Sequence, residues 1–157
     1  MAEHRSVSLF REYLRIKSVQ PDPDYEGCMA FLKERARVMG LPCNIVENYP
    51  GSGRPDNLFL LSSKLINSPW AGRTIFLMTW EGTEPELPSL LLNSHTDVVP
   101  VFPECWKHDP FAAVKEENGD IYGRGTQDMK SVGIQHLEAV RILKESGVRL
   151  KRTIHFW

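Results

Sequence analysis

The feature that most constrains the fold is a short apolar run that ends in a histidine and a carboxylate. Residues 89–94 read Ser-Leu-Leu-Leu-Asn-Ser, and His95, Thr96 and Asp97 follow them directly. A nearly all-apolar run of this length is typical of a strand buried on both faces, inside a sheet that helices cover. We therefore expect an α/β fold with a polar pair just past the end of a buried strand, where open α/β sheets place their ligand sites.

The rest of the chain predicts the other layers of such a fold. The expected elements are helices over 6–17, 26–39 and 127–146, strands over 42–48, 74–80 and from 152 onward, and a hairpin within 112–125 that turns at Asn118-Gly119. The apolar stretch 58–66 is compatible with either a helix or a strand. The order of these elements predicts an α/β sheet covered by helices, and a final buried strand normally connects onward, so the sheet is expected to be incomplete.

Two expectations concern burial. The helix over 127–146 has an apolar stripe that we expect to face the core, consisting of Met129, Val132, His136, Val140 and Leu143. The last strand lacks the elements that would cover it. We therefore expect Ile154, Phe156 and Trp157 to be more exposed than is usual for their residue types.

Composition excludes several classes of function. The chain has 157 residues, enough for one domain, and its formal net charge of -1 predicts no attraction to nucleic acid or to an anionic membrane. No apolar run approaches the about 18 residues of a membrane span, and the N-terminus lacks a signal-peptide core. The three cysteines, Cys28, Cys43 and Cys105, form no C-x-x-C motif. An odd, unpatterned set of cysteines favours a reducing, cytoplasmic setting.

His95 and Asp97 have the residue types of a metal-binding pair. A neutral imidazole is a good zinc ligand, and a nearby carboxylate fixes which ring nitrogen carries the proton. The alternative is an ordinary turn, since Ser, Thr and Asp are common where strands end. Both interpretations remain open on this motif alone, because short motifs often match by chance.

A further carboxylate, Asp128, stands at the start of the helix expected over 127–146, after Gly123-Arg124-Gly125. Its alternative role is that of a helix-start residue favoured by the helix dipole. A phosphate-binding loop is disfavoured, because Met129 and Asp128 occupy positions where the two common glycine motifs require glycine. A carboxylate at that point would also repel an anionic phosphate.

Several segments together resemble one known family. They are "YLRIKSVQPDPDY" at 13–25, "LLNSHTDVVPVF" at 91–102, and "RGTQDMK" at 124–130 followed by "RTIH". They resemble the dizinc metallopeptidase family that includes aminoacylases, carboxypeptidases and succinyl-diaminopimelate desuccinylases. The resemblance implies that His95 binds zinc, that Asp97 supports catalysis at the site, and that Asp128 bridges two zinc ions. It also implies the N-terminal part of a metallopeptidase-like catalytic domain that hydrolyses small N-acyl-L-amino acids.

The same resemblance predicts what residues 1–157 lack. In the family, the strand that begins like "RTIH" continues to two adjacent glutamates, one a general base and one a zinc ligand, and an inserted domain forms the homodimer. With two ligands, the site has fewer than the three that a catalytic zinc usually has. We therefore expect this chain to be inactive alone and to lack the dimerisation domain; its alternative role is a non-catalytic binding or regulatory partner of a full-length relative. Residues 52–71 have no counterpart in the family pattern and are expected to be an insertion.

Overall fold

The structure is a computed structural model that describes residues 3–47 and 74–156. Its helices and strands, in chain order, are α1 (Arg5–Leu14), α2 (Tyr25–Met39), β1 (Cys43–Glu47), β2 (Thr74–Trp80), β3 (Leu90–Leu92), the 3-10 turn η1 (Pro103–Cys105), β4 (Val114–Lys115), β5 (Ile121–Tyr122), α4 (Lys130–Glu145) and β6 (Ile154–Phe156). The expected insertion at 52–71, the ambiguous stretch 58–66 and Trp157 lie outside the described residues. No helix within the described ranges is long and apolar enough to cross a membrane.

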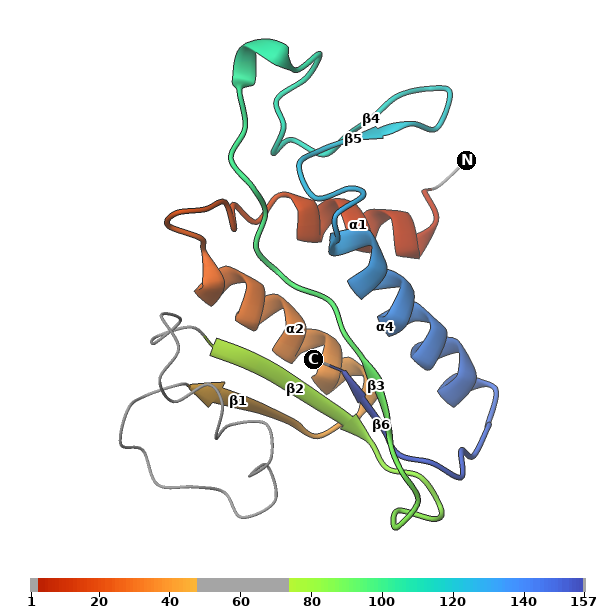
Figure 1. The fold of residues 1–157 in the computed structure, drawn as a ribbon. Helices are drawn as coiled ribbons and strands as arrows, with labels where there is room; N and C mark the ends of the chain where they lie inside the picture. Colours follow the sequence, from red (N-terminus) through yellow and green to blue (C-terminus); the bar gives the residue numbers. More distant parts are fainter. Residues whose placement is uncertain (1–2, 48–73, 157) are drawn as a thin grey trace.

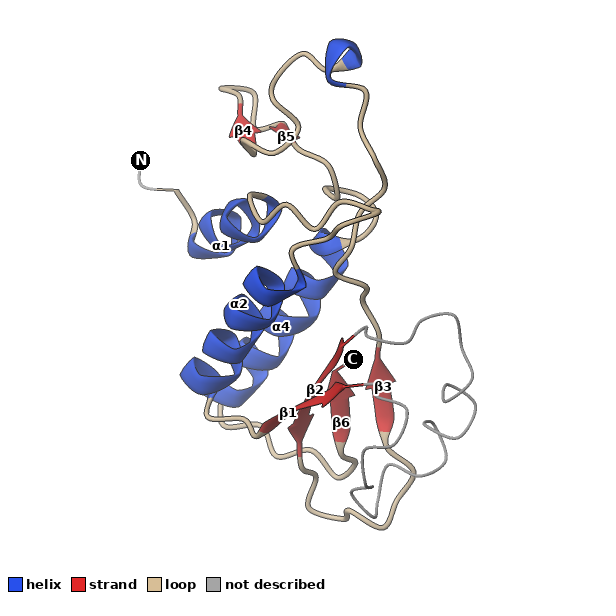
Figure 2. Cartoon of the chain, turned by 90° about the vertical axis from the view of Figure 1, so that its left-hand side faces the viewer, coloured by secondary structure: helices blue, strands red, loops and turns tan. Residues whose placement is uncertain are grey.

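A four-stranded sheet forms the base of the fold, in the order β1-β2-β6-β3. Strand β2 pairs antiparallel with both β1 and β6, whereas β3 pairs parallel with β6. Helices α2 and α4 lie on the same side of this sheet, and α1 packs against α4 (Figures 1 and 2). The predicted α/β class, with a sheet covered by helices, is confirmed. The short β4–β5 hairpin stands apart from the sheet (Figure 1) and turns at Gly119, as predicted.

Local sequence signals explain where the helices begin and end. The side chain of Asp24 accepts a hydrogen bond from Gly27 N at 2.8 Å and caps the start of α2. Gly40 ends α2 in the left-handed conformation, with φ of 61°. Helix α1 is capped by His4, whose Nδ1 accepts a hydrogen bond from Ser6 N at 3.3 Å. Serine is a commoner N-cap residue, but Ser6 lies inside the helix.

The expectation that the last strand is exposed is wrong. Ile154 and Phe156 are only 9% and 6% exposed. Strand β6 lies between β2 and β3, so its backbone is paired on both sides and its apolar side chains enter the core that the sheet shares with the helices. A strand late in the chain thus takes an interior position in the sheet.

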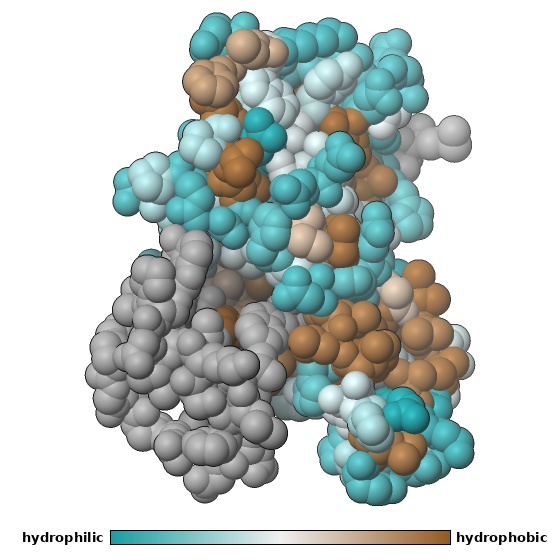
Figure 3. All heavy atoms as spheres, viewed as in Figure 1, coloured by the Kyte–Doolittle hydropathy of each residue, from teal (hydrophilic) through white to brown (hydrophobic). Residues whose placement is uncertain are grey.

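The expectation that residues 89–94 are buried on both faces is also wrong. Leu90 and Leu91 are 50% and 47% exposed, because β3 is an edge strand in the described part of the sheet. Figure 3 shows apolar surface gathered over β3 and the C-terminal end of α4. The exposed Ile142 and Leu143 belong to that end of α4.

The predicted stripe on α4 is displaced around the helix. Of its members only Val140 is fully buried, and the other buried residues of α4 are Lys130, Ile134, Leu137 and Glu138. Two of these are charged, and both have partners. Glu138 accepts hydrogen bonds from Ser6 and Arg141, and the Lys130 ammonium donates to backbone carbonyls. Lys130 and Glu138 are buried because each has hydrogen-bond partners. A prediction based on the spacing of apolar residues does not include such buried charged residues.

Candidate metal centre

His95 and Asp128 meet where the segment after β3 approaches the start of α4. The Nε2 atom of His95 lies 3.0 Å from Oδ1 of Asp128. Two ligands of one tetrahedral zinc, each about 2.0–2.2 Å from the ion, lie roughly 3 to 4 Å apart. The two side chains therefore have the separation of neighbouring ligands, and they lie on the same side of the fold.

The other ring nitrogen of His95 fixes the tautomer. Nδ1 lies 2.8 Å from the backbone carbonyl oxygen of Asp97 and 3.5 Å from its carboxylate Oδ1. A carbonyl oxygen only accepts, so Nδ1 carries a proton, and Nε2 presents a lone pair to Asp128 whenever the ring holds only that one proton. A lone pair facing a carboxylate oxygen at 3.0 Å is repulsive unless a proton or a metal cation lies between them. The geometry therefore fits a metal ion, with a simple surface ion pair as the alternative.

The set of ligands is small. Within residues 3–47 and 74–156, no group of three or more His, Cys, Asp or Glu side chains is arranged to hold a metal ion. The side chain of Asp128 is 81% exposed and that of His95 is 44% exposed. The pair thus forms one wall of a site that is open to solvent.

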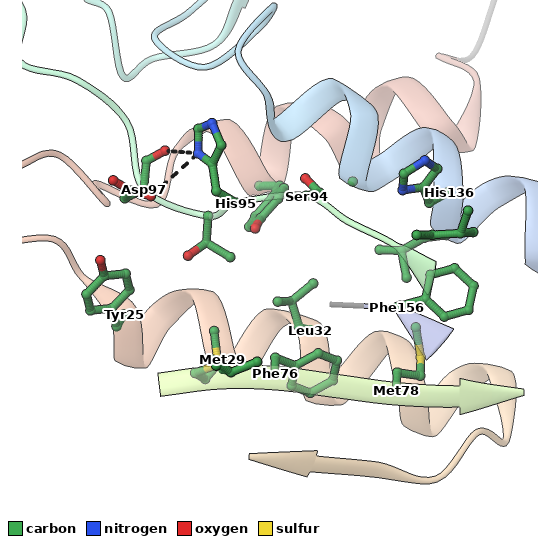
Figure 4. Close-up of a pocket in the computed structure, with 16 residues that line it drawn as sticks. Tyr25, Met29, Leu32, Phe76, Met78, Ser94, His95, Asp97, His136 and Phe156 are labelled. Carbon is green, nitrogen blue, oxygen red and sulfur yellow. Dashed lines mark hydrogen bonds and ion pairs between the residues drawn. The ribbon is translucent and has the colours of Figure 1, made fainter. Parts of the chain in front are cut away.

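Asp97 is itself held by a residue from the N-terminal region. Its Oδ2 accepts a hydrogen bond from the Gln20 carboxamide at 2.8 Å, which leaves Oδ1 toward the His95 ring (Figure 4). The neighbouring backbone is tied to the same region, because Ser18 Oγ donates to Thr96 O at 2.6 Å and Val98 N donates to Ser18 O at 2.8 Å. Sequence reasoning missed Ser18 and Gln20. The segment at 13–25 was noted for resemblance, but nothing local marks these residues as part of a site.

Asp128 lies in the turn before α4, and its peptide bond to Met129 is cis. Gly125 begins this turn with φ of 93°, and a Cβ there would lie 2.9 Å from Val98 Cγ1, so a side chain would push the turn away from the β3 end. At the start of α4, Ser94 Oγ donates to Met129 O at 3.3 Å. Backbone contacts of this kind bring the two halves of the site together.

Lys130 fastens the same turn to α1. It is fully buried, and its ammonium donates to Tyr13 O at 3.0 Å and to Ile16 O at 2.8 Å. Tyr13 O lies in the last turn of α1 and Ile16 O lies just past its end, and each also accepts a backbone hydrogen bond, from Ile16 N and Ser18 N respectively. Burial lowers the pKa of Lys130 to about 8. Lys130 therefore also helps to hold the site, and the sequence motif gave no sign of this role.

A pocket of about 220 Å³ lies below the segment that carries His95 and Asp97. Figure 4 shows apolar side chains from α2, β2 and β6 along it, with His136 at the far end. Burial lowers the pKa of His136. His108 is elsewhere and bonds to Glu116 at 2.7 Å beside the β4–β5 hairpin. The structure thus places neither His108 nor His136 beside Asp128.

Comparison with known proteins finds relatives that match nearly the whole chain. Aminoacylase-1 of Mus musculus is 55% identical over 154 residues, and aminoacylase-1 of Homo sapiens is 53% identical over 153 residues. Each match covers 98% of this chain. Residues 91–157 match the model of peptidase family M20/M25/M40. The chain is thus similar to aminoacylase-1 over nearly all of its length, and its residues 91–157 match the M20 family model.

The match covers only part of the relatives. The chain spans 33% of the mouse protein and 32% of the human protein. Among solved structures, an M20 family metallo-carboxypeptidase from Sulfolobus solfataricus, Sso-CP2, superposes with a TM-score of 0.72 over 98% of this chain and 30% of its own, at 22% identity. At that identity the likeness shows a shared fold, and it agrees with a part of the M20 catalytic domain.

Proposed function

We propose that residues 1–157 carry one wall of the metal centre of a zinc-dependent aminoacylase, which hydrolyses N-acyl-L-amino acids to a carboxylate and a free amino acid. In this proposal His95 and Asp128 are zinc ligands and Asp97 supports His95. The observation that carries it is the 3.0 Å approach of His95 Nε2 to Asp128 Oδ1, with Nδ1 committed to the Asp97 carbonyl. The aminoacylase-1 relatives supply the substrate class.

The residue types suit this chemistry. A bound zinc ion supplies a Lewis acid for the amide carbonyl and makes a water molecule acidic enough to attack it at neutral pH. His95 is suited to bind as a neutral ring, because the hydrogen bond at Nδ1 leaves Nε2 free for the ion. Asp128 has two carboxylate oxygens, of which one faces His95, so it is able to bridge two ions as an imidazole cannot.

The proposal includes weak metal binding and no turnover by residues 1–157 acting alone. Two ligands replace the hydration shell of a metal less well than the three that a catalytic zinc usually has. The described residues offer no third His, Cys, Asp or Glu beside the pair. A chain of this kind would act as part of a larger enzyme, or as a non-catalytic binding partner of a full-length relative.

The proposed setting is the cytoplasm. Cys28, Cys43 and Cys105 are all free thiols, which suits a reducing compartment. The partner expected is the small N-acyl-amino acid itself. The formal net charge of -1 offers nothing that would recruit nucleic acid or an anionic membrane.

Two measurements on the purified protein test the proposal. The first is release of acetate from N-acetyl-L-methionine, with added zinc and again with a chelator. Turnover that survives the chelator contradicts the metal assignment, and zinc-dependent turnover at an ordinary enzyme rate, about 1 per second or faster, contradicts inactivity of the chain alone. The second is co-purification with a full-length aminoacylase, which favours the role of a binding partner.

A further inference from the structure

The segment between α1 and α2 contacts the segment after β3 at four points. Two join the backbones directly: Val98 N donates to Ser18 O at 2.8 Å, and Gln20 N donates to Val98 O at 3.0 Å. The other two use side chains, from Ser18 Oγ to Thr96 O and from Gln20 Nε2 to Asp97 Oδ2. Val19 and Val98 form a parallel bridge at the same place. Residues 18–20 thus run alongside residues 96–98 like a short additional strand.

Only one of these contacts reaches a charged atom beside the candidate ligand. The Gln20 carboxamide donates to Oδ2 of Asp97 at 2.8 Å, while Oδ1 of the same carboxylate lies 3.5 Å from His95 Nδ1. A carboxylate is free to rotate about the bond that joins it to Cβ. A donor on Oδ2 limits that rotation and keeps Oδ1 facing the ring.

The backbone of Gln20 is also held in place. The backbone N–H of Gln20 donates to Val98 O, one residue past Asp97, so the backbone that carries the carboxamide is fixed. Ser18 is fully buried. Its hydroxyl holds Thr96 O at 2.6 Å, which fixes the backbone between His95 and Asp97. The donor and the carboxylate are therefore both anchored before any metal binds.

We propose that Gln20 is a positioning residue of the metal centre: by holding Oδ2 of Asp97 it fixes the residue whose carbonyl oxygen lies 2.8 Å and whose Oδ1 lies 3.5 Å from Nδ1 of His95, and so orients Nε2 toward the metal. The inference rests on the proposed function, because it requires His95 to be a ligand. Partners that orient a metal ligand typically change metal affinity by about 10–100-fold when they are mutated. Gln20 acts one step further out through Asp97, so we expect an effect of about three- to tenfold.

The experiment compares a substitution that keeps the length of Gln20 but removes the donor with one that is an atom longer and keeps a donor. Gln20→Met keeps the unbranched shape but has no donor, whereas Gln20→Lys keeps a donor that is able to reach Asp97. Zinc affinity is measured by competition with a chromophoric chelator, the visible spectrum of bound cobalt reports the geometry around the ion, and the urea midpoint reports stability. The expected result is about three- to tenfold weaker zinc binding and a changed cobalt spectrum for Gln20→Met, with affinity within about twofold of wild type for Gln20→Lys.

The outcomes separate this inference from the proposal beneath it. His95→Ala serves as the reference variant. If His95→Ala weakens zinc binding but Gln20→Met does not, the positioning role is wrong and the ligand assignment stands. If Gln20→Met and Gln20→Lys are equally weak, the contact is merely structural, which also overturns the inference. If His95→Ala binds zinc like wild type, the proposed function itself fails. Should Gln20→Met not fold, Gln20→Asn, which is one methylene too short for the contact, replaces it.

Discussion

His95 Nε2 lies 3.0 Å from Asp128 Oδ1 although the two residues are 33 positions apart in the sequence. One stands after an edge strand and the other before a helix, so the contact depends on how the sheet and α4 pack together. Neither side chain supports the core, because both are largely open to solvent. The contact between His95 and Asp128 is therefore not needed for the stability of the fold.

Substitution of His95 is expected to separate metal binding from folding. His95→Ala should weaken zinc binding at least about tenfold, because a ligand is lost. It should change the free energy of unfolding by no more than about 0.5 kcal/mol, as is usual for exposed positions. Isothermal titration with zinc and urea unfolding measure the two effects. His108→Ala is the matched control, since His108 also bonds to a carboxylate, Glu116, but lies outside the site. Equal losses of affinity in both variants would contradict the assignment.

Removal of the buried ammonium of Lys130 should destabilise the protein. Lys130→Met removes the charged donor from Tyr13 O and Ile16 O, which keep only backbone donors, and the loss of a hydrogen bond to a charged group costs about 1.5–3 kcal/mol. The relief from burying a charge offsets part of that cost, so we expect a net loss of about 1–3 kcal/mol in urea unfolding. Lys33→Met, on the exposed face of α2, is the control and should have little effect. An unchanged midpoint for Lys130→Met would show that the two hydrogen bonds contribute nothing net.

The interior position of β6 predicts a large cost for truncating Phe156. Phe156→Ala should lower the free energy of unfolding by about 3–5 kcal/mol, because a side chain that is 6% exposed leaves a cavity in the core. Leu91→Ala is the comparison on the neighbouring strand, where the side chain is 47% exposed, and it should cost about 1 kcal/mol or less. Similar losses in the two variants would mean that β6 does not contribute to the core as described.

Glu138 predicts a dependence of stability on pH. Burial by itself raises the pKa of Glu138, but hydrogen bonds from Arg141 and Ser6 outweigh it, so the pKa lies below the usual 4.5. The stabilisation is complete above pH 4.5 and is lost as the pH falls through the lowered pKa, because the folded state then has to take up a proton.

The stability difference between wild type and Glu138→Gln should therefore be largest near neutral pH and should shrink on acidification. Thermal or urea unfolding between about pH 7 and pH 3 measures it. The lowered pKa values of Glu3, Glu34 and Glu116 act in both proteins and cancel in the difference. A difference that grows toward acid pH would mean that the pKa of Glu138 is raised in the folded state.

Much of the secondary structure of the described residues follows from local patterns along the chain. Strand β2 spans the predicted range 74–80, and α2 ends at Met39, just before Gly40. The spacing of apolar residues, the capping residues and the turn residues each act over a few positions, so the sequence alone is enough to predict their effect. For His95, Asp97 and Asp128, residue types and spacing leave a turn and a helix start as alternatives, and the prediction of a metal site comes from the resemblance of the joined motifs to the dizinc family.

The packing of the sheet against the helices determines which residues hold the candidate site and which strands lie inside the sheet. Gln20 reaches Asp97 across 77 positions, and Lys130 reaches Tyr13 O across 117. Neither residue carries a local signal, because a hydrogen bond depends on where packing places its two atoms. The burial of Phe156 and the exposure of Leu91 likewise follow from the strand order, in which β6 is interior and β3 is at the edge. Apolar residues show that a strand has something to bury, but its neighbours in the sheet and the helices above it decide how much of it is buried.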